Sequence, residues 1–263
     1  MTSLLDPVLN PILNMVAGDS ILGPFYLILI FSFLISLVIS VVYKLMTDQD
    51  LMRSLKSEMK ELQKEMKTLR KDPEKLMQVQ KKSMETNMKY MTKSFKPTLI
   101  TLIPIIIIFG WMSSHLAYYP IMENDSFTTT ITLEEHLIGQ NISIDVPIGI
   151  NLTSSEEQLI ESNTVSWVMK GKMGTYSLIY LVDDKSYEKE VIISDKFGDY
   201  AEVEKIVKDD TVQSITVSNE AVKPIRSIGL GFIPWIGNFG WLGCYIILSI
   251  IFSITIRKIM KIA

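Results

Sequence analysis

Residues 24–43 read PFYLILIFSFLISLVISVVY and contain no charged side chain. Two further stretches share this property: Thr98–Leu116, which begins TLITLIPIIIIFGWM, and Gly229–Ile256. A helix needs about 20 apolar residues to cross the hydrocarbon core of a bilayer, and each stretch is long enough. The sequence therefore predicts an α-helical integral membrane protein with three transmembrane helices.

The first apolar run is predicted to be a retained span and not a cleaved signal peptide. The residues before it carry Asp6 and Asp19 but no lysine or arginine. A signal peptide has a basic start and a short apolar stretch that ends in small residues. Residues 3–17, with Asp6, Asn10 and Asn14 at four-residue spacing, predict a short amphipathic segment in the outer membrane interface rather than a disordered tail.

The basic residues beside the spans predict the orientation of the chain. Residues 44–97 hold 14 Lys or Arg against 8 Asp or Glu, whereas residues 118–228 hold 9 against 19. The tail adds Arg257, Lys258 and Lys261. Because cytoplasmic loops are enriched in basic residues, we expect the N-terminus and the 118–228 loop outside, and the 44–97 loop and C-terminus in the cytosol.

The cytosolic loop has the pattern of a helical hairpin. Thr47-Asp-Gln-Asp is a helix cap with acidic side chains at the N-terminus. Apolar side chains then alternate at spacings of four and three, the pattern of a coiled coil. They are Leu55, Met59, Leu62, Met66 and Leu69. The pattern breaks at Lys71-Asp-Pro-Glu and resumes with a second apolar row: Met77, Met84, Met88, Met91 and Phe95. We expect an antiparallel coiled-coil hairpin.

The outer loop changes to β-branched, partly alternating segments separated by turn residues such as Gly171-Lys-Met-Gly and Asp183-Asp-Lys-Ser. Such segments predict short strands. They are 126–133, 141–148, 164–169, 175–182, 186–193 and 212–218. About six short strands in roughly 100 residues are typical of a small β-sandwich, so we expect an extracytoplasmic β-sandwich-like insertion.

These patterns divide the chain into seven parts. The expected parts are 1–23, an outer amphipathic segment; 24–43, the first span; 44–97, the hairpin; 98–117, the second span; 118–230, the β-rich domain; 231–256, the third span with a preceding interfacial segment; and 257–263, the cytosolic tail.

Methionines are concentrated in the hairpin and at its root. Methionine is flexible and polarizable, and it recurs on surfaces that accept varied hydrophobic partners. The same residues can instead close the interface between the two hairpin helices, and the pattern leaves both readings open. The candidate partner-capture residues are Met52, Met59, Met66, Met77, Met84, Met88 and Met91.

Hydroxyl side chains recur at four-residue spacing in the spans. Ser32, Ser36 and Ser40 share one face of the first span, and Ser249 and Ser253 share one face of the third. Thr101 lies in the second span. Such stripes can line a hydrated polar groove, or they can let helices pack closely and hydrogen-bond. Lys44 and Arg257 stand at the span ends, where long cationic side chains commonly anchor.

No catalytic constellation is evident, and we expect neither an enzyme nor a cofactor. His115 and His136 are far from any cysteine and give no metal-ligand spacing. No phosphate-binding glycine loop or nucleophile elbow occurs. Intermixed glutamates in the basic hairpin argue against recognition of a specific nucleic acid sequence. Asn124, Asn141 and Asn151 begin possible N-glycosylation sequons, and all three lie in the loop placed outside.

Several stretches together resemble a known family. They are Tyr43-Lys-Leu-Met-Thr-Asp-Gln-Asp, Asp72-Pro-Glu-Lys, Ser94-Phe-Lys-Pro-Thr-Leu, Pro104 through Phe109-Gly-Trp-Met, Phe239-Gly-Trp-Leu-Gly and Ile256-Arg-Lys. They are similar to archaeal YidC-like membrane proteins, the domain of unknown function 106 family, which is grouped with the YidC/Oxa/Alb insertases.

The resemblance implies a membrane protein insertase or chaperone of the archaeal plasma membrane. Its three spans would surround a lipid-open polar groove, lined by the serines and Thr101, with Lys44 and Arg257 at the cytosolic mouth. Implied partners are nascent membrane proteins, the lipid bilayer, a ribosome or translocon, and a small membrane subunit. Bacterial members carry a groove arginine, whereas this first span has none, and Lys44 is the nearest cation.

A second function remains open at this stage. The chain can be a receptor or scaffold whose outer β-domain binds a ligand and whose cytosolic hairpin binds a partner. That function predicts a strict requirement for residues 126–218 and little effect of changes in the serine stripes.

Overall fold

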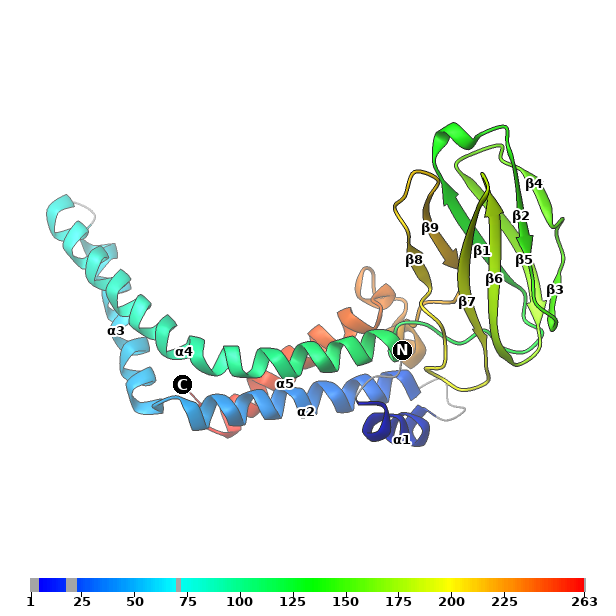
Figure 1. Ribbon diagram of the computed structural model, residues 1–263. Coiled ribbons are helices and arrows are strands. Elements are labelled where there is room, and N and C mark those ends of the chain that lie inside the picture. Colours follow the sequence, from blue (N-terminus) through cyan, green and yellow to red (C-terminus); the bar gives the residue numbers. More distant parts are fainter. Residues whose placement is uncertain (1–4, 18–22, 70–71, 263) are drawn as a thin grey trace. The chain divides into compact units, whose positions relative to one another are not determined.

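A computed structural model describes residues 5–17, 23–69 and 72–262 (Figure 1). Within these residues, three helices are long and apolar enough to cross a membrane: α2 (Gly23–Met46), α4 (Pro73–Leu116) and α5 (Trp241–Ile259). The prediction of three membrane spans is confirmed in the length and apolar composition of these helices. The second span is not a separate helix, because α4 runs unbroken from the hairpin through Pro97 and Pro104.

The chain forms two compact units, which we describe separately. The helical unit comprises Ile28–Gly110 and Leu242–Ala263, and the β-rich unit comprises Met1–Leu27 and Trp111–Trp241. The helical unit therefore holds most of each span together with α3 (Gln49–Thr68).

The predicted cap begins α3. The Asp48 carboxylate accepts hydrogen bonds from the backbone N–H groups of Asp50 (3.1 Å) and Leu51 (3.0 Å), two of the donors that a helix start leaves unpaired. Met52, Leu55 and Leu62 form the buried side of α3. Pro73 begins α4, the position where a missing N–H costs nothing. The tip residues 70–71 lie outside the described part.

The second arm of the hairpin uses a different face from the one expected. Glu58 of α3 pairs with Lys82 of α4 (3.6 Å), and the covered side of α4 carries a mixture of aliphatic side chains and side chains with a hydroxyl group. They are Leu76, Val79, Ser83, Thr86, Tyr90 and Ser94, at spacings of three and four. The predicted apolar row from Met77 to Phe95 is exposed instead. Four of its five members, Met77, Met84, Met91 and Phe95, stand one residue after a covered one, which is about 100° around a helix of 3.6 residues per turn.

Nine antiparallel strands make two sheets in the β-rich unit (Figure 1). All six predicted strands are present: β1 (Phe127–Leu133), β2 (Asn141–Asp145), β5 (Thr164–Gly171), β6 (Gly174–Val182), β7 (Lys185–Ile193) and β9 (Val212–Val217). Three short strands were not predicted: β3 (Ile150–Leu152), β4 (Glu157–Leu159) and β8 (Glu204–Ile206). The sheet orders are β3-β5-β1-β9-β8 and β4-β2-β6-β7.

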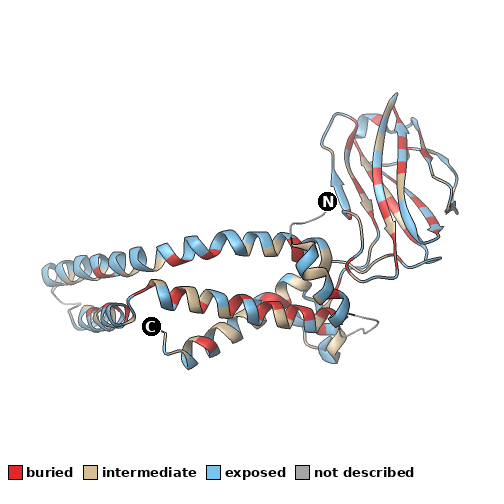
Figure 2. Cartoon of the chain, turned by 60° about the horizontal axis from the view of Figure 1, so that its bottom comes forward, coloured by how far each residue is buried: buried red, intermediate tan, exposed pale blue. Residues whose placement is uncertain are grey.

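The two sheets share one core. Their strands alternate buried and exposed residues, the period expected when one face is covered (Figure 2). Trp167 of one sheet packs edge-on against Tyr180 of the other, with ring centroids 5.6 Å apart. The Tyr180 hydroxyl also hydrogen-bonds the buried Thr129 hydroxyl. Asp183 and Asp184 form the two-residue turn of the β6–β7 hairpin with positive φ, as such a turn requires.

The N-terminal segment is helical in its described part. Helix α1 (Asp6–Ala17) contacts the end of α4, where the Trp111 indole N–H donates to the Asp6 carboxylate (3.1 Å). Leu13 is buried. The predicted polar face of this segment is therefore partly covered by protein. Asp6 accepts the hydrogen bond from Trp111, and the Asn10 side-chain oxygen is buried. Residues 1–4 and 18–22 of the predicted segment lie outside the described residues.

Candidate functional site: a serine-lined cleft between two spans

A cleft of about 290 Å³ lies between α2 and α5 in the helical unit. Its lining combines three serine hydroxyls with apolar side chains and one tyrosine. The lining residues are Ser36, Ile39, Tyr245, Ser249, Ile250, Ser253 and Ile254. The sequence brings these groups together because serines at four-residue spacing share one helix face on each span.

Two of the lining serines form a polar contact between α2 and α5. The Ser36 hydroxyl donates to the Ser249 carbonyl oxygen at 3.4 Å, a long and weak hydrogen bond. The Ser249 hydroxyl donates to the Ile246 carbonyl of its own helix at 2.9 Å. Small side chains with this geometry let the two backbones approach while keeping polar groups in the bilayer region.

The other predicted groove residues lie outside the lining of this cleft. Ser32 and Ser40 are fully buried, and neither hydroxyl has a hydrogen-bond partner among the described residues. Thr101 is also buried, and its hydroxyl donates to the Pro97 carbonyl of its own helix (3.1 Å). Sequence spacing groups the hydroxyls by face, but it does not say which face meets a neighbour.

Tyr245 brings α4 to the wall of the cleft. Its ring packs edge-on against Phe109 of α4, with centroids 4.8 Å apart. Phe33 of α2 makes a similar contact with Phe252 of α5 at 5.5 Å. These aromatic residues were not predicted as site residues, because an isolated ring in an apolar span carries no periodic pattern.

At the end of the spans that leads into the hairpin, Tyr43 connects all three helices. Its hydroxyl hydrogen-bonds Ser94 of α4 at 3.3 Å, and the Arg257 guanidinium of α5 lies 5.0 Å from its ring centroid. A cation over an aromatic face is attracted by the electron-rich ring. Arg257 was predicted as a residue of the groove mouth. Tyr43 was not predicted as a site residue, although a tyrosine at the end of a span is typical of the membrane interface.

The second predicted mouth residue caps the end of α5. The Lys44 ammonium donates to the Met260 carbonyl oxygen (3.0 Å), and Arg53 of α3 donates to the Lys261 carbonyl oxygen (2.6 Å). Carbonyl groups at a helix C-terminus lack partners within the helix and carry partial negative charge. These two cations therefore stabilise the end of the third span and connect it to the hairpin.

The predicted partner-capture methionines divide into two groups. Met52 is fully buried, and Met59 and Met66 are half-buried on α3. Four methionines on α4 are exposed by 57–73%. They are Met77, Met84, Met88 and Met91; with Phe95, they form a row that we call the methionine row. The row is about 27 Å long at 1.5 Å per residue.

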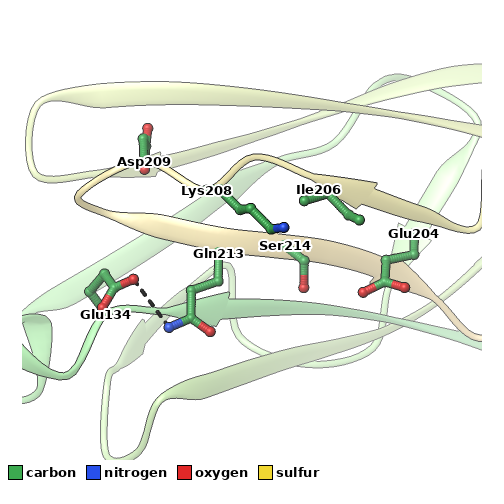
Figure 3. A pocket seen from close by; sticks show the side chains of 7 residues that line it. All are labelled: Glu134, Glu204, Ile206, Lys208, Asp209, Gln213 and Ser214. Carbon is green, nitrogen blue, oxygen red and sulfur yellow. Dashed lines mark hydrogen bonds between the residues drawn. The ribbon is translucent and has the colours of Figure 1, made fainter.

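Outside the helical unit, a shallow hollow of about 390 Å³ lies against β8 and β9 (Figure 3). Gln213 donates to Glu134 there at 3.1 Å. Asp209 accepts from the backbone N–H groups of Val212 (2.6 Å) and Thr211 (2.9 Å), and these bonds lower its pKa. Asp209 thus stabilises its own turn, and the described residues contain no group of His, Cys, Asp or Glu side chains placed to hold a metal ion.

The three candidate glycosylation sites are all exposed on the β-rich unit. Asn124 lies in a turn with positive φ, Asn141 begins β2, and Asn151 is the central residue of β3. The Asn141 side chain donates to Glu157 at 2.9 Å.

Taken together, three apolar helices, a serine cleft between two of them and a β-rich insertion define a multi-pass membrane protein related to insertases. The family model for integral membrane proteins of the EMC3/TMCO1-like type matches residues 6–141, just over half of the chain. The chain belongs to this family, which is part of the Oxa1/YidC/Alb3 insertase-related superfamily. No curated protein and no solved structure matches it significantly.

Proposed function

We propose that the protein is a membrane protein insertase or chaperone, which assists nascent transmembrane segments on their way into lipid. The serine cleft between α2 and α5 carries this proposal. Taking a polar group into hydrocarbon costs several kcal/mol, and a hydroxyl-lined path lowers that cost. The same cleft is lined by three isoleucines and a tyrosine, so a passing segment would meet polar and apolar surface together.

The methionine row supports the same function. Exposed methionines on one helix form a flexible apolar surface that adapts to different partners. Met84, Met88 and Met91 stand on the arm of α4 that continues directly into the second span. A nascent segment bound on this arm is thereby held on the same helix that enters the membrane. We propose that the hairpin is an antiparallel coiled coil that lies in the cytosol and receives clients from a ribosome or translocon.

The charge asymmetry supports the proposed orientation, with the β-rich unit outside and the hairpin and C-terminus in the cytosol. The hairpin segment carries 14 basic residues, against 9 in the longer β-rich loop. Protease added to sealed inverted vesicles should cut the hairpin and spare the β-rich unit. Cleavage of the β-rich unit with protection of the hairpin would indicate the opposite orientation.

Site-specific photo-crosslinking tests the function. A crosslinker at Ser253 in the cleft and one at Met84 on the methionine row should capture nascent membrane proteins during translation. Thr255 is the matched control, because it is an exposed hydroxyl residue on α5 outside the cleft lining. Equal adducts at Ser253 and Thr255 would contradict a client path through the cleft.

Filling the cleft gives a second, independent test. Ser253→Leu places an apolar branched side chain in the lining, whereas Thr255→Leu makes the same kind of change outside it. We expect the first variant to slow insertion of clients with polar flanking segments and the second to leave it unchanged.

The methionine row is tested by substitution as well. Replacing Met84, Met88 and Met91 by serine should lower client capture, whereas replacing the exposed Met122 and Met173 of the β-rich unit by serine should not.

A receptor or scaffold is the competing function, and the structure makes it testable by excision. The two ends of the β-rich insertion meet, because Tyr119 N–H donates to the Glu220 carbonyl (2.8 Å) and Val222 N–H donates to the Ala117 carbonyl (2.9 Å). Residues 121–218 can therefore be replaced by a short linker. An insertase should retain client insertion after this change, and a receptor should lose its function.

A further inference from the structure

The segment that joins β9 to α5 contains a second cavity. It has a volume of about 440 Å³ and belongs to the β-rich unit. Its lining residues include two cations, one carboxylate and two hydroxyl groups. The lining residues are Tyr119, Glu220, Ala221, Lys223, Arg226 and Ser227.

The two cations are available to a ligand. Neither Lys223 nor Arg226 forms an ion pair with another side chain in the described part of the chain. The exposed Glu220 is the one carboxylate of the lining, so the cavity has a net positive charge. The backbone holds the cations on consecutive turns, because the Arg226 N–H donates to the Lys223 carbonyl at 3.1 Å. A guanidinium beside an ammonium suits a phosphate group.

The residues that follow the cavity are apolar and exposed. From Ser227 to Ile256 the sequence has no charged residue, and this stretch continues directly into the span α5. Phe232 is 78% exposed and Trp235 is 85% exposed. Aromatic residues in such positions typically lie at the headgroup level of a bilayer.

Trp235 combines an exposed side chain with an unusual backbone conformation. Trp235 has φ +71°, a conformation that costs a non-glycine residue energy and that persists where the surroundings impose it. The loop is compact: a Cβ on Gly231 would lie 2.8 Å from the Arg226 side chain, and a Cβ on Gly237 would lie 2.6 Å from the Gly231 backbone. The loop of residues 231–237, which carries Phe232 and Trp235, therefore passes close to the Arg226 side chain at Gly231.

We propose that this cavity binds the phosphate group of an anionic membrane lipid. Lys223 and Arg226 hold the phosphate, and Phe232 and Trp235 contact the glycerol and upper acyl region of the same lipid. The site anchors the root of the β-rich unit to the leaflet on its own side of the membrane. A soluble phosphate compound would satisfy the two cations but would leave the adjacent aromatic side chains in water, so the combination favours a lipid.

Quenching of Trp235 fluorescence by brominated lipids tests the proposal at the site itself. The full-length protein is placed in phosphatidylcholine vesicles that contain a small fraction of brominated phosphatidylglycerol or brominated phosphatidylcholine. The Trp235 signal is the difference between the parent protein and Trp235→Phe. A local readout is needed because the basic hairpin also attracts anionic lipid.

We expect phosphatidylglycerol to quench Trp235 at a lower mole fraction than phosphatidylcholine. Membrane-surface cations contribute about 1 kcal/mol each, so the double variant Lys223→Gln/Arg226→Gln should lose roughly 30-fold in lipid preference. The charge-preserving variant Lys223→Arg/Arg226→Lys should retain most of it. Lys170→Gln/Lys172→Gln, which removes two exposed lysines elsewhere on the β-rich unit, should have no effect.

Three results would overturn the proposal. The first is equal quenching by the two lipids in the parent protein. The second is an unchanged lipid preference in a double glutamine variant whose circular dichroism matches the parent. The third is competition by inorganic phosphate at constant ionic strength as effective as that by phosphatidylglycerol, because it would assign the cavity to a soluble phosphate compound.

Discussion

Replacing Ser32 and Ser40 by alanine should stabilise the helical unit. The two side chains are 0% and 1% exposed, and neither hydroxyl has a hydrogen-bond partner among the described residues. Burying a hydroxyl without a partner costs about 1–3 kcal/mol in water-soluble proteins. Alanine removes the hydroxyl and keeps the Cβ, so it relieves this cost without opening a large cavity.

The expected gain is smaller than that range. In membrane proteins the unfolded reference state also finds polar partners, and measured hydrogen-bond effects average about 0.6 kcal/mol. We therefore expect about 0.5–1 kcal/mol for each change. The two serines stand eight residues apart on α2, about 12 Å along the helix, so the effects should add. The double variant should gain about 1–2 kcal/mol.

Reversible unfolding in sodium dodecyl sulfate, followed by circular dichroism, measures this free energy. Ser36→Ala is the matched control, since it removes the weak 3.4 Å bond to the Ser249 carbonyl and should be neutral or slightly destabilising. Destabilisation of the double variant by about 1 kcal/mol or more would refute the reasoning. It would mean that these hydroxyls are hydrogen-bonded in the membrane and belong to a hydrated path.

Two further predictions concern the β-rich unit. Tyr180→Phe removes the buried hydrogen bond to Thr129 and should cost about 1–2 kcal/mol, seen as a lower melting temperature in calorimetry; an unchanged melting temperature would argue against a role for this bond. Burial raises the pKa of Tyr200, whose hydroxyl bonds Ala117 N–H and the Ser113 carbonyl, to about 12. The phenol ionises near pH 10 in the unfolded chain. The protonated Tyr200 hydroxyl therefore contributes fully to the free energy of unfolding below pH 10, and this contribution falls as the pH rises towards 12. Tyr200→Phe should flatten that alkaline decline in a pH series of unfolding curves, and an equally steep decline would contradict the assignment.

Much of the fold follows from local sequence. Charge-free runs specify spans because an unpaired charge in hydrocarbon is costly. The β-branched alternation in the outer loop marked all six of the longer strands, whereas β3, β4 and β8, with three residues each, are too short to show a period. The cap at Asp48 and the start of α4 at Pro73 are equally local, since each depends on backbone groups within one helical turn.

The candidate site was predicted less completely. The serine spacing correctly groups hydroxyls on single helix faces, but only Ser36, Ser249 and Ser253 of the six proposed groove residues line the cleft. Tyr43 and Tyr245, which join the helices around it, were missed. A periodic pattern can mark the covered face of a helix, but it does not show which residue of a distant helix lies against that face.

The sequence by itself determined that this protein has three membrane spans, a helical hairpin and a β-rich insertion, because hydropathy, charge and side-chain alternation act over a few residues. Tertiary structure decided which side of each element is covered. On α4 the covered row includes Leu76, Ser83 and Tyr90, and the methionine one position after each of them is exposed. A shift of one residue turns a helix face by about 100°, and only packing against α3 determines which of two adjacent rows is buried.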